Sequence, residues 1–360
     1  MDKKEYHPAK TDMKWMNLGG NKNQAINRLI DANLDRAREG LRVIEDWCRF
    51  GLNQKQIVVT LKDWRQQLGT HHHEIYKRAR DTKSDQGIGL EHPAQKNRHS
   101  PEQVVAANFS RVQEALRVLE EFCRNSDPEL ANSASRIRYG LYELESKVMQ
   151  TILHTKLLQK LQNCNLCLIT TPHSNLSTTI EESLKAGVKM VQYRSKKESD
   201  LEKFEQAKEL AYLCKKYDAL FIINDHLDLA IAVDADGIHL GQSDLPTKVV
   251  RNILGDQKLI GRSTHCLEQL HTAEYEGCDY FGVGPIFPTK TKPDQKPVGI
   301  DYVKEASLAA KRPWFAIGGI NASNIEEVVA AGAERVALIG AVMNSNDPAA
   351  IILELQSKLP

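Results

Sequence analysis

Eight short apolar runs in the second part of the chain narrow the possible folds more than any other feature. Each run is rich in β-forming residues and is followed by a stretch whose apolar residues recur at helical spacing. The runs are NLCLIT, KMVQYR, LFIIND, DGIHLG, KLIGRST, YFGVGPI, PWFAIGG and RVALIGA. Strands that alternate with helices indicate a parallel sheet. The even count, with glycines ending the last two strands, favours a closed (β/α)8 TIM barrel over a doubly wound sheet.

The first part of the chain has a helical pattern and contains a repeat. The stretch ANLDRAREGLRVIEDWCR (32–49) recurs 75 residues later as ANFSRVQEALRVLEEFCR (107–124). In each copy the apolar residues fall on one helical face, and a second helical stretch follows each copy. The predicted buried stripes are Leu34, Ala37, Leu41, Ile44 and Cys48, and Phe109, Val112, Leu116, Leu119 and Cys123. We expect an all-α domain built from a duplicated helical hairpin, packed as a bundle of about four helices.

A chain of 360 residues is too long for one ordinary domain, which agrees with this change of pattern. We expect a polar tail at 1–20 and an all-α domain at 21–155. A linker helix at 156–163 would then lead into the α/β barrel domain at 164–360.

The composition limits the partners. A content of 41% hydrophobic and 26% charged residues is typical of a soluble globular protein. A net charge of +1 argues against nucleic acid or an anionic membrane as partner, and no apolar run has membrane-spanning or signal-peptide character. Seven scattered cysteines fit the reducing cytoplasm, although Cys164 and Cys167 have redox-motif spacing. We expect small-molecule substrates and leave a homo-oligomer open.

In a TIM barrel the active site lies at the carboxyl ends of the strands. From the second strand to the eighth, these ends carry Gln192, Arg194 and Lys196; Asn224 and Asp225; Asp244; Ser263 and His265; Thr289, Thr291 and Lys292; Gly318 and Gly319; Ile339 and Gly340. Asp225 and Asp244 are hard oxygen ligands from adjacent strand ends, which suits Mg²⁺. The cationic side chains could hold an anion that carries more than one charge. The glycines would let backbone N–H groups approach a phosphate.

Six stretches in order resemble thiamine phosphate synthases, across nearly all of 166–360. They are QYRSK, IINDHLDLA, ADGIHLGQSDLP, GRSTH, YFGVGPIFPTKTK and AIGGINASNI. The resemblance implies a Mg²⁺-dependent transferase of thiamine biosynthesis. That family joins 4-amino-2-methyl-5-hydroxymethylpyrimidine diphosphate to 4-methyl-5-(2-hydroxyethyl)thiazole phosphate, giving thiamine phosphate and diphosphate. The chain departs from the family around its first strand, LCLITTPHS, where an aromatic residue and an Asp are usual.

The resemblance also implies a role for each matching residue. The pyrimidine diphosphate would be held by Gln192, Arg194, Lys196, Asn224, Ser263 and Lys292, of which Arg194, Lys196, Ser263 and Lys292 are the expected catalytic residues. Mg²⁺ would be bound by Asp225 and Asp244. The thiazole phosphate would be held by Thr289, Lys290, Thr291, Gly319, Ile339 and Gly340.

The chemistry fits this set. An electron-rich aminopyrimidine can stabilise a cation at its CH₂ group, so diphosphate can leave before the thiazole nitrogen attacks with its own lone pair. The protein must then neutralise the leaving group and align the partners, with no base or nucleophile of its own. The alternative function is an isomerase like thiazole tautomerase, a related barrel that shares the phosphate end. The diphosphate and Mg²⁺ residues favour the transferase.

The apolar stripes leave five repeated polar pairs unexplained: Asn33/Asn108, Arg36/Arg111, Glu39/Glu114, Arg42/Arg117 and Glu45/Glu120. One interpretation is a duplication whose charges form ion pairs along each helix. Another is a polar site between the copies. The helical part resembles a domain fused to some thiamine phosphate synthases and linked to pyrimidine phosphate metabolism. The arginines paired on the twin helices, with the stretch RDTKSD between the copies, suggest a site for an anionic pyrimidine phosphate formed by Arg36, Arg42, Arg111 and Arg117 with Asp81. A dimerisation module is the third possibility.

Overall fold

The computed structural model of the chain describes residues 19–83, 98–289 and 295–360. These residues form two compact units, one within residues 1–149 and the other within residues 150–360. None of the helices in the described ranges is both long enough and apolar enough to cross a membrane.

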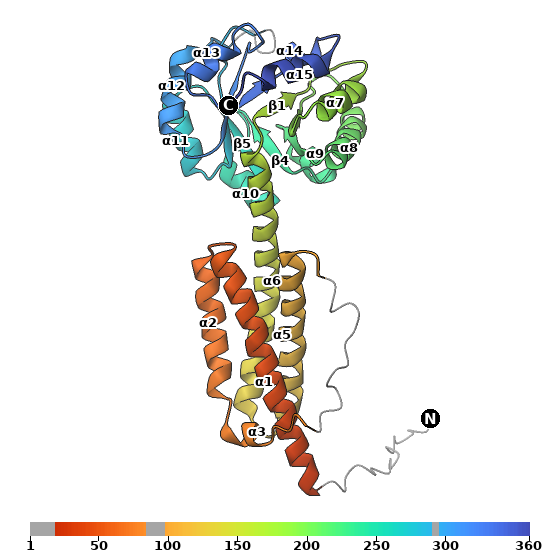
Figure 1. The fold of residues 1–360 in the computed structure, drawn as a ribbon, viewed down its shortest axis with the longest axis vertical. Coiled ribbons are helices and arrows are strands. Elements are labelled where there is room, and N and C mark those ends of the chain that lie inside the picture. The colour runs from red at the N-terminus through yellow and green to blue at the C-terminus, as the bar shows by residue number, and fades with distance from the viewer. Residues whose placement is uncertain (1–18, 84–97, 290–294) are drawn as a thin grey trace, which may run out of the picture. The chain divides into compact units, whose positions relative to one another are not determined.

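The first unit is helical, as the sequence predicts. Its helices are α1 (Gly19–Phe50), α2 (Lys55–Thr70), the short α3 (Glu74–Arg78), α5 (Pro101–Cys123) and α6 (Pro128–Gln162). Figure 1 shows α1, α2, α5 and the first part of α6 side by side. The predicted duplicated hairpin is therefore α1 with α2 and α5 with α6. Helix α1 already begins at Gly19, inside the expected tail, and residues 1–18 lie outside the described part.

The two copies of the repeated helix pack against each other through the predicted stripes. All ten stripe residues have exposed fractions of 0%. At Gly40 a Cβ atom would lie 2.5 Å from Cγ2 of Val112, so α1 and α5 approach closely at this point. Ser100 begins α5 as its N-cap and accepts a hydrogen bond from the backbone N–H of Gln103. Apolar burial, rather than surface charge, thus holds the copies together.

One repeated charge in each copy has a structural role. Glu45 of α1 is 1% exposed and accepts a hydrogen bond of 3.0 Å from Nε of Arg65 on α2. Its counterpart Glu120 of α5 accepts hydrogen bonds of 2.8 and 3.1 Å from Arg138 on α6. Each glutamate therefore ties the repeated helix to the second helix of its own hairpin.

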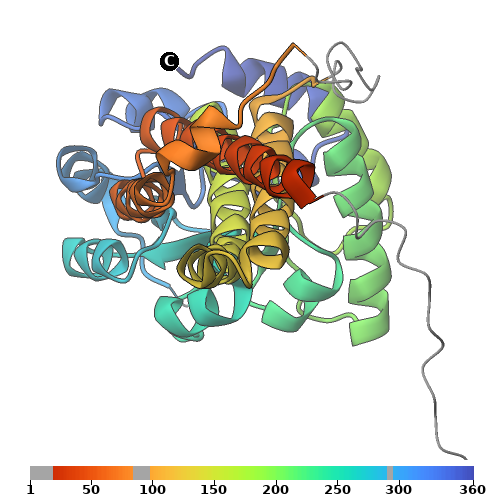
Figure 2. The ribbon, with the colours of Figure 1, turned by 90° about the horizontal axis from the view of Figure 1, so that it is seen from below.

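The second unit is a closed barrel of eight parallel strands in sequential order, which confirms the predicted fold. The strands are β1 (Leu166–Ile169), β2 (Met190–Tyr193), β3 (Leu220–Asn224), β4 (Gly237–Leu240), β5 (Leu259–Thr264), β6 (Tyr280–Val283), β7 (Trp314–Ile317) and β8 (Val336–Leu338). The helices that follow them are α7 (Leu176–Lys185), α8 (Asp200–Lys216), α9 (Leu227–Ala232), α10 (Thr247–Leu254), α11 (Leu267–Tyr275), α12 (Gly299–Ala309), α13 (Ile325–Ala330), α14 (Gly340–Met343) and α15 (Pro348–Gln356). In Figure 2 these helices, coloured green to blue, form an outer ring.

Side chains fill the barrel interior, as in other barrels of eight strands. The aromatic ring of Tyr280 is buried in this interior and packs edge-to-face on Phe315, with ring centroids 5.9 Å apart. A Cβ atom on Gly261 would lie 2.1 Å from Cζ of Tyr280, so a larger residue would displace the ring. The interior is apolar at this level, and the polar residues that face inward lie at the carboxyl ends of the strands.

Helix α6 continues through the expected linker. Residues 156–162 are its last turns rather than a separate linker helix. Leu161, which is fully buried, belongs to the same apolar cluster as Tyr280 and Phe315. On the neighbouring helical turns, Nε2 of His154 lies 3.0 Å from Oδ1 of Asp279. The end of α6 therefore packs as part of the barrel unit.

Candidate functional site

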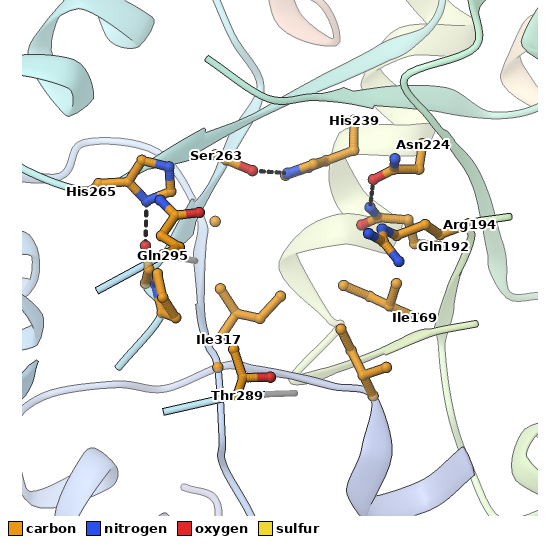
Figure 3. Close-up of a pocket in the computed structure, with 15 residues that line it drawn as sticks. Ile169, Gln192, Arg194, Asn224, His239, Ser263, His265, Thr289, Gln295 and Ile317 are labelled. Carbon is orange, nitrogen blue, oxygen red and sulfur yellow. Dashed lines mark hydrogen bonds between the residues drawn. The ribbon is translucent and has the colours of Figure 1, made fainter. Parts of the chain in front are cut away.

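A pocket lies at the carboxyl ends of the barrel strands, where the sequence analysis places the active site. Its lining comprises Ile169, Gln192, Arg194, Asn224, His239, Ser263, His265, Gly282, Gly284, Pro285, Thr289, Gln295, Ile317, Gly318 and Ile339. In Figure 3, Gln192, Arg194 and Asn224 lie on one side, and His265 and Gln295 lie on the opposite side. The predicted residues Gln192, Arg194, Asn224, Ser263, Thr289 and Ile339 are thus brought to one pocket.

The polar side of this pocket is ordered by hydrogen bonds between strands. Nε2 of Gln192 donates to Oδ1 of Asn224 at 2.8 Å, which fixes how both amides face the pocket. The hydroxyl of Thr170 accepts a hydrogen bond of 2.8 Å from the backbone N–H of Arg194. It also lies 3.2 Å from the backbone oxygen of Arg194. Thr170 belongs to the first-strand stretch where the sequence departs from the family. There it holds the backbone of Arg194, which is predicted to bind the diphosphate.

Arg194 is half-buried at the edge of the pocket. Burial lowers the pKa of its guanidinium group, while the negative charge of Asp225 acts in the opposite direction. An arginine remains protonated despite such a shift, because its ordinary pKa is above about 12. Arg194 therefore presents a partly desolvated positive charge, which strengthens its attraction for an anion.

His239 is a pocket residue that the sequence reasoning missed. It lies inside strand β4, and its Nε2 atom is 3.0 Å from Oγ of Ser263. Its Nδ1 atom is 3.2 Å from the hydroxyl of the buried Tyr280. The inward alternation of β4, with Gly237 and His239 facing the same side, was the signal that could have identified it. The contacts Tyr280–His239 and His239–Ser263 thus link the barrel core to the pocket.

The two predicted metal ligands follow neighbouring strands. Asp225 comes directly after β3, is exposed, and has a positive φ of 63°, a conformation that costs free energy for a residue other than glycine. Its backbone N–H donates to the carbonyl of His239 at 2.9 Å. Asp244 follows β4, and its Oδ2 atom accepts a 2.6 Å hydrogen bond from the backbone N–H of Gly241. Both carboxylates thus stand at adjacent strand ends, but neither residue belongs to the lining of the pocket. As hard oxygen donors they are of the type that suits Mg²⁺.

A second pocket of about 320 Å³ lies over the ends of β6, β7 and β8. It is lined by Thr289, Gly319, Ile339 and Gly340 of the predicted thiazole phosphate set, together with Thr171, Pro288, Gly318, Ile320, Asn321, Ala337, Ala341 and Asn344. Gly318 and Gly319 have φ values of 103° and 69°. A Cβ atom on Gly319 would lie 2.8 Å from the carbonyl oxygen of Pro288, so only glycine fits without displacing this backbone.

Some predicted residues line neither pocket, among them the two predicted metal ligands Asp225 and Asp244. Strand β2 ends at Tyr193, so Lys196 lies beyond the strand that carries Gln192. Lys196 is exposed in the loop that follows. Lys290, Thr291 and Lys292 lie outside the described residues.

The predicted arginines of the helical unit separate into two groups. Arg36 and Arg111 line one pocket between α1 and α5. Arg42 and Arg117 do not line it. Arg42 pairs with Glu45 at 3.6 Å and Asp46 at 3.0 Å, and Arg117 pairs with Glu120 at 3.2 Å and Glu121 at 2.7 Å. Asp81 is exposed outside the lining, and its backbone oxygen accepts a hydrogen bond from Arg28. The expected grouping of all four arginines with Asp81 is therefore wrong.

The closely spaced cysteines are core residues. Cys164 and Cys167 are both buried and belong to the apolar cluster around Tyr280. Burial raises the pKa of the Cys164 thiol to about 12 and raises the pKa of the Cys167 thiol well above its ordinary value. Protonated, buried thiols are poor nucleophiles and poor metal ligands, so this pair has a packing role.

Comparisons with known proteins cover both units. A model of the family "Thiamine monophosphate synthase" matches residues 166–342, and a model of the "ThiD2 family" matches residues 28–147. A thiamine-phosphate synthase of Prochlorococcus marinus is 63% identical over 93% of this chain and 96% of the relative. A thiamine-phosphate synthase from a Synechocystis species is 46% identical over 93% of this chain and 96% of the relative. The solved structure of a Pyrococcus furiosus thiamine phosphate pyrophosphorylase is 36% identical, with a TM-score of 0.51, and covers 56% of this chain and 96% of that one.

Proposed function

Because this chain belongs to the thiamine-phosphate synthase family, we propose that its barrel joins hydroxymethylpyrimidine diphosphate to hydroxyethylthiazole phosphate, forming thiamine phosphate and diphosphate. The observation that carries the proposal is the convergence of Gln192, Arg194, Asn224 and Ser263 on one pocket beside a second, glycine-lined pocket. Two pockets that share Thr289, Gly318 and Ile339 suit two substrates that must react with each other.

In this proposal the first pocket holds the pyrimidine. The Gln192–Asn224 amide pair offers hydrogen bonds to the aminopyrimidine ring. The Arg194 guanidinium neutralises negative charge on the leaving diphosphate, with Lys196 and Lys292 as further cations. Ser263, oriented by His239, offers a hydroxyl to the same group. These groups act by electrostatic stabilisation of charge that develops on the leaving group.

Mg²⁺ is part of the proposal. Asp225 and Asp244 would hold the ion, and their two carboxylates match its preference for hard oxygen ligands. Bound there, Mg²⁺ would stabilise the negative charge of the diphosphate.

The second pocket would hold the thiazole phosphate. Gly319 and Gly340 line it, and because they have no side chain a phosphate could approach the backbone N–H groups there. The Thr289 hydroxyl, with Lys290 and Thr291, would add polar contacts. The C–O bond to diphosphate breaks first, and the thiazole nitrogen then forms the new C–N bond with its own lone pair. The protein therefore aligns the partners and supplies no base.

We place the enzyme in the cytoplasm, since all seven cysteines are free thiols in the structure, which suits a reducing compartment. The assay that tests the function supplies both substrates and Mg²⁺ to the full chain and measures thiamine phosphate and diphosphate in equal amounts. Turnover of a thiazole isomer without release of diphosphate would favour the tautomerase alternative instead.

A further inference from the structure

Three consecutive histidines follow α2, and their contacts divide between two parts of the helical unit. The side chain of His72 is 5% exposed, and its Nε2 atom lies 2.8 Å from Oδ1 of Asp31 on α1. His71 and His73 instead lie near Asp127, the residue before α6. One ring nitrogen of each of these two histidines and one carboxylate oxygen of Asp127 lie within 4.8 Å of one another. The cluster lies outside the pockets described above, and the reaction proposed for the barrel does not use it.

Hydrogen bonds to both oxygens hold the carboxylate of Asp127 in place. Its Oδ1 atom accepts a hydrogen bond of 3.0 Å from the backbone N–H of Leu130, so Asp127 caps the start of α6. Its Oδ2 atom accepts a hydrogen bond of 3.1 Å from the hydroxyl of Tyr76 on α3. Burial, and then the negative charge of Asp127, raise the pKa of Tyr76 to about 12, so this hydroxyl stays protonated and donates. Each carboxylate oxygen has a further lone pair, which leaves acceptor capacity for a cation.

The two histidines differ in how they are held. Nε2 of His71 lies 3.3 Å from Oγ of Ser133 on α6, and the same oxygen accepts a hydrogen bond of 3.1 Å from the side chain of Gln67 on α2. A histidine that binds a metal through one ring nitrogen typically forms such a contact through the other, which fixes the ring. His73 is exposed, and its ring nitrogens form no hydrogen bond with another residue of the described part of the chain. Its ring can therefore turn toward an ion.

Two imidazoles and one carboxylate are the donor set of a borderline divalent metal ion rather than of Mg²⁺, which prefers oxygen ligands alone. In a tetrahedral Zn²⁺ site the ligand atoms lie about 3.4 Å apart, since each is about 2.0 to 2.2 Å from the ion. The present spread exceeds that value by at most about 1.4 Å, which rotation of the exposed His73 side chain can close. We propose that His71, His73 and Asp127 form a binding site for a divalent transition-metal ion, Zn²⁺ being the ion whose ligand preferences they match.

The position of the site defines what the ion would do. It would join the segment between α2 and α3 to the start of α6, two parts of the helical unit that are distant in the sequence. An ion that binds only when these ligands are brought together stabilises the folded arrangement. Three protein ligands leave a fourth position for water. The proposed role is thus a cross-link at one end of the helical unit, independent of the Mg²⁺ proposed for the barrel.

The test uses the full chain without a histidine tag, freed of metal with EDTA and then dialysed. Calorimetry with Zn²⁺ compares the unchanged protein with His73→Ala and with Asp127→Asn, which retains a good helix cap. His271→Ala is the matched control, because it removes an exposed histidine of α11 in the barrel unit. Asp35→Asn changes a second His–carboxylate group of the helical unit, and Asp225→Asn changes the proposed Mg²⁺ site. Circular dichroism checks that each variant is folded.

We expect one Zn²⁺ per chain, bound at least about tenfold more weakly by His73→Ala and by Asp127→Asn, because each variant loses one of three ligands. Tyr76→Phe should also weaken binding by about tenfold, since it removes the hydroxyl that orients Asp127. The affinity of His271→Ala should equal that of the unchanged protein. Unchanged binding in both ligand variants would overturn the site. Loss of binding in Asp35→Asn or Asp225→Asn instead would assign the ion to those groups and overturn it as well.

Two further measurements separate a built site from adventitious binding by surface histidines. Several weakly bound ions per chain, all insensitive to Tyr76→Phe, would indicate an adventitious ion only and overturn the proposal. Hydrogen exchange supplies the second readout. Zn²⁺ should slow exchange of the amides in α3 and at the start of α6 in the unchanged protein, and it should have no such effect in His73→Ala. Equal protection by Zn²⁺ in both proteins would contradict the cross-link.

Co²⁺ provides a spectroscopic check, because its visible absorption reports its ligands. A band that appears with the unchanged protein and with His271→Ala, and is lost in His73→Ala, would support the site. The same band in all three proteins would overturn it.

Discussion

Nε2 of His239 lies 3.0 Å from Oγ of Ser263, inside a pocket whose other polar residues come from different strands. The same imidazole lies 3.2 Å from the Tyr280 hydroxyl, so the ring is held from both sides. This relationship makes His239 a positioning residue, because it orients a hydroxyl that faces the proposed diphosphate.

The first prediction follows from that pair. His239→Ala should lower kcat/KM for the pyrimidine diphosphate by about tenfold, the usual effect of one lost hydrogen bond. Steady-state kinetics of His239→Ala, Ser263→Ala and the double variant provide the test. If His239 acts through Ser263, the double variant should be little worse than Ser263→Ala. Additive losses would contradict the positioning role, and His271→Ala, on the exposed face of α11, is the control.

Asp225 gives a second prediction, about the metal. Asp225→Asn keeps the size of the side chain but removes a negative ligand, so turnover should fall by orders of magnitude and the Mg²⁺ concentration for half-maximal rate should rise. Asp228→Asn, an exposed carboxylate in the first turn of α9, should leave both unchanged. Full activity of Asp225→Asn, or activity that EDTA does not reduce, would rule out the metal assignment.

A third prediction concerns the glycine at the end of β7. Gly319→Ala introduces a Cβ atom that would lie 2.7 Å from Cβ of Phe287 and 2.8 Å from the Pro288 oxygen. The shifted loop should raise KM for the thiazole phosphate more than KM for the pyrimidine diphosphate. Gly277→Ala is the matched control, because Gly277 also has a positive φ but its Cβ would meet nothing within 4 Å. Equal changes in both Michaelis constants would argue against separate subsites.

The fourth prediction is a pH-dependent stability. Burial raises the pKa of Glu120, but hydrogen bonds and charge from Arg138 and Arg117 outweigh it, so the net shift is downward. A lowered pKa means that the pair stabilises the folded protein above the unfolded value of about 4.3, and that this contribution is lost as pH falls below it. Glu120→Gln should cost about 2 to 3 kcal/mol at neutral pH, since it leaves Arg138 buried without its carboxylate.

Hydrogen exchange of the α5 and α6 amides measures the local loss of stability caused by Glu120→Gln, without assuming that the two units unfold together. The difference between Glu120→Gln and the unchanged protein should shrink on acidification below about pH 4.3. Glu121→Gln is the control, because Glu121 is 43% exposed and its pairs with Arg117 and Arg124 are at the surface. Its cost should stay below about 1 kcal/mol. A pH-independent difference for Glu120→Gln would show that packing, not charge, is responsible.

Sequence patterns predicted the fold well because they report burial directly. The eight apolar runs became the eight strands, and the repeated stripes became the contact between α1 and α5. The positions at strand ends also carried over, as Gln192, Arg194 and Ser263 show. His239 was missed because one histidine inside an apolar strand resembles a core residue until its neighbours are known. Arg42 was grouped wrongly because repetition along a sequence does not reveal which carboxylates lie within reach.

The continuity of α6 affects how the two units can be dissected. A fragment that begins at Leu158 would expose the last turns of a helix whose Leu161 belongs to the buried cluster around Tyr280, and it would lack His154, one of the partners of Asp279. A fragment that begins at Gln150 keeps both contacts. Weak activity of the shorter fragment would therefore reflect a barrel whose core is partly exposed to solvent rather than a requirement for the helical unit. An experiment on the separate barrel should use the longer fragment.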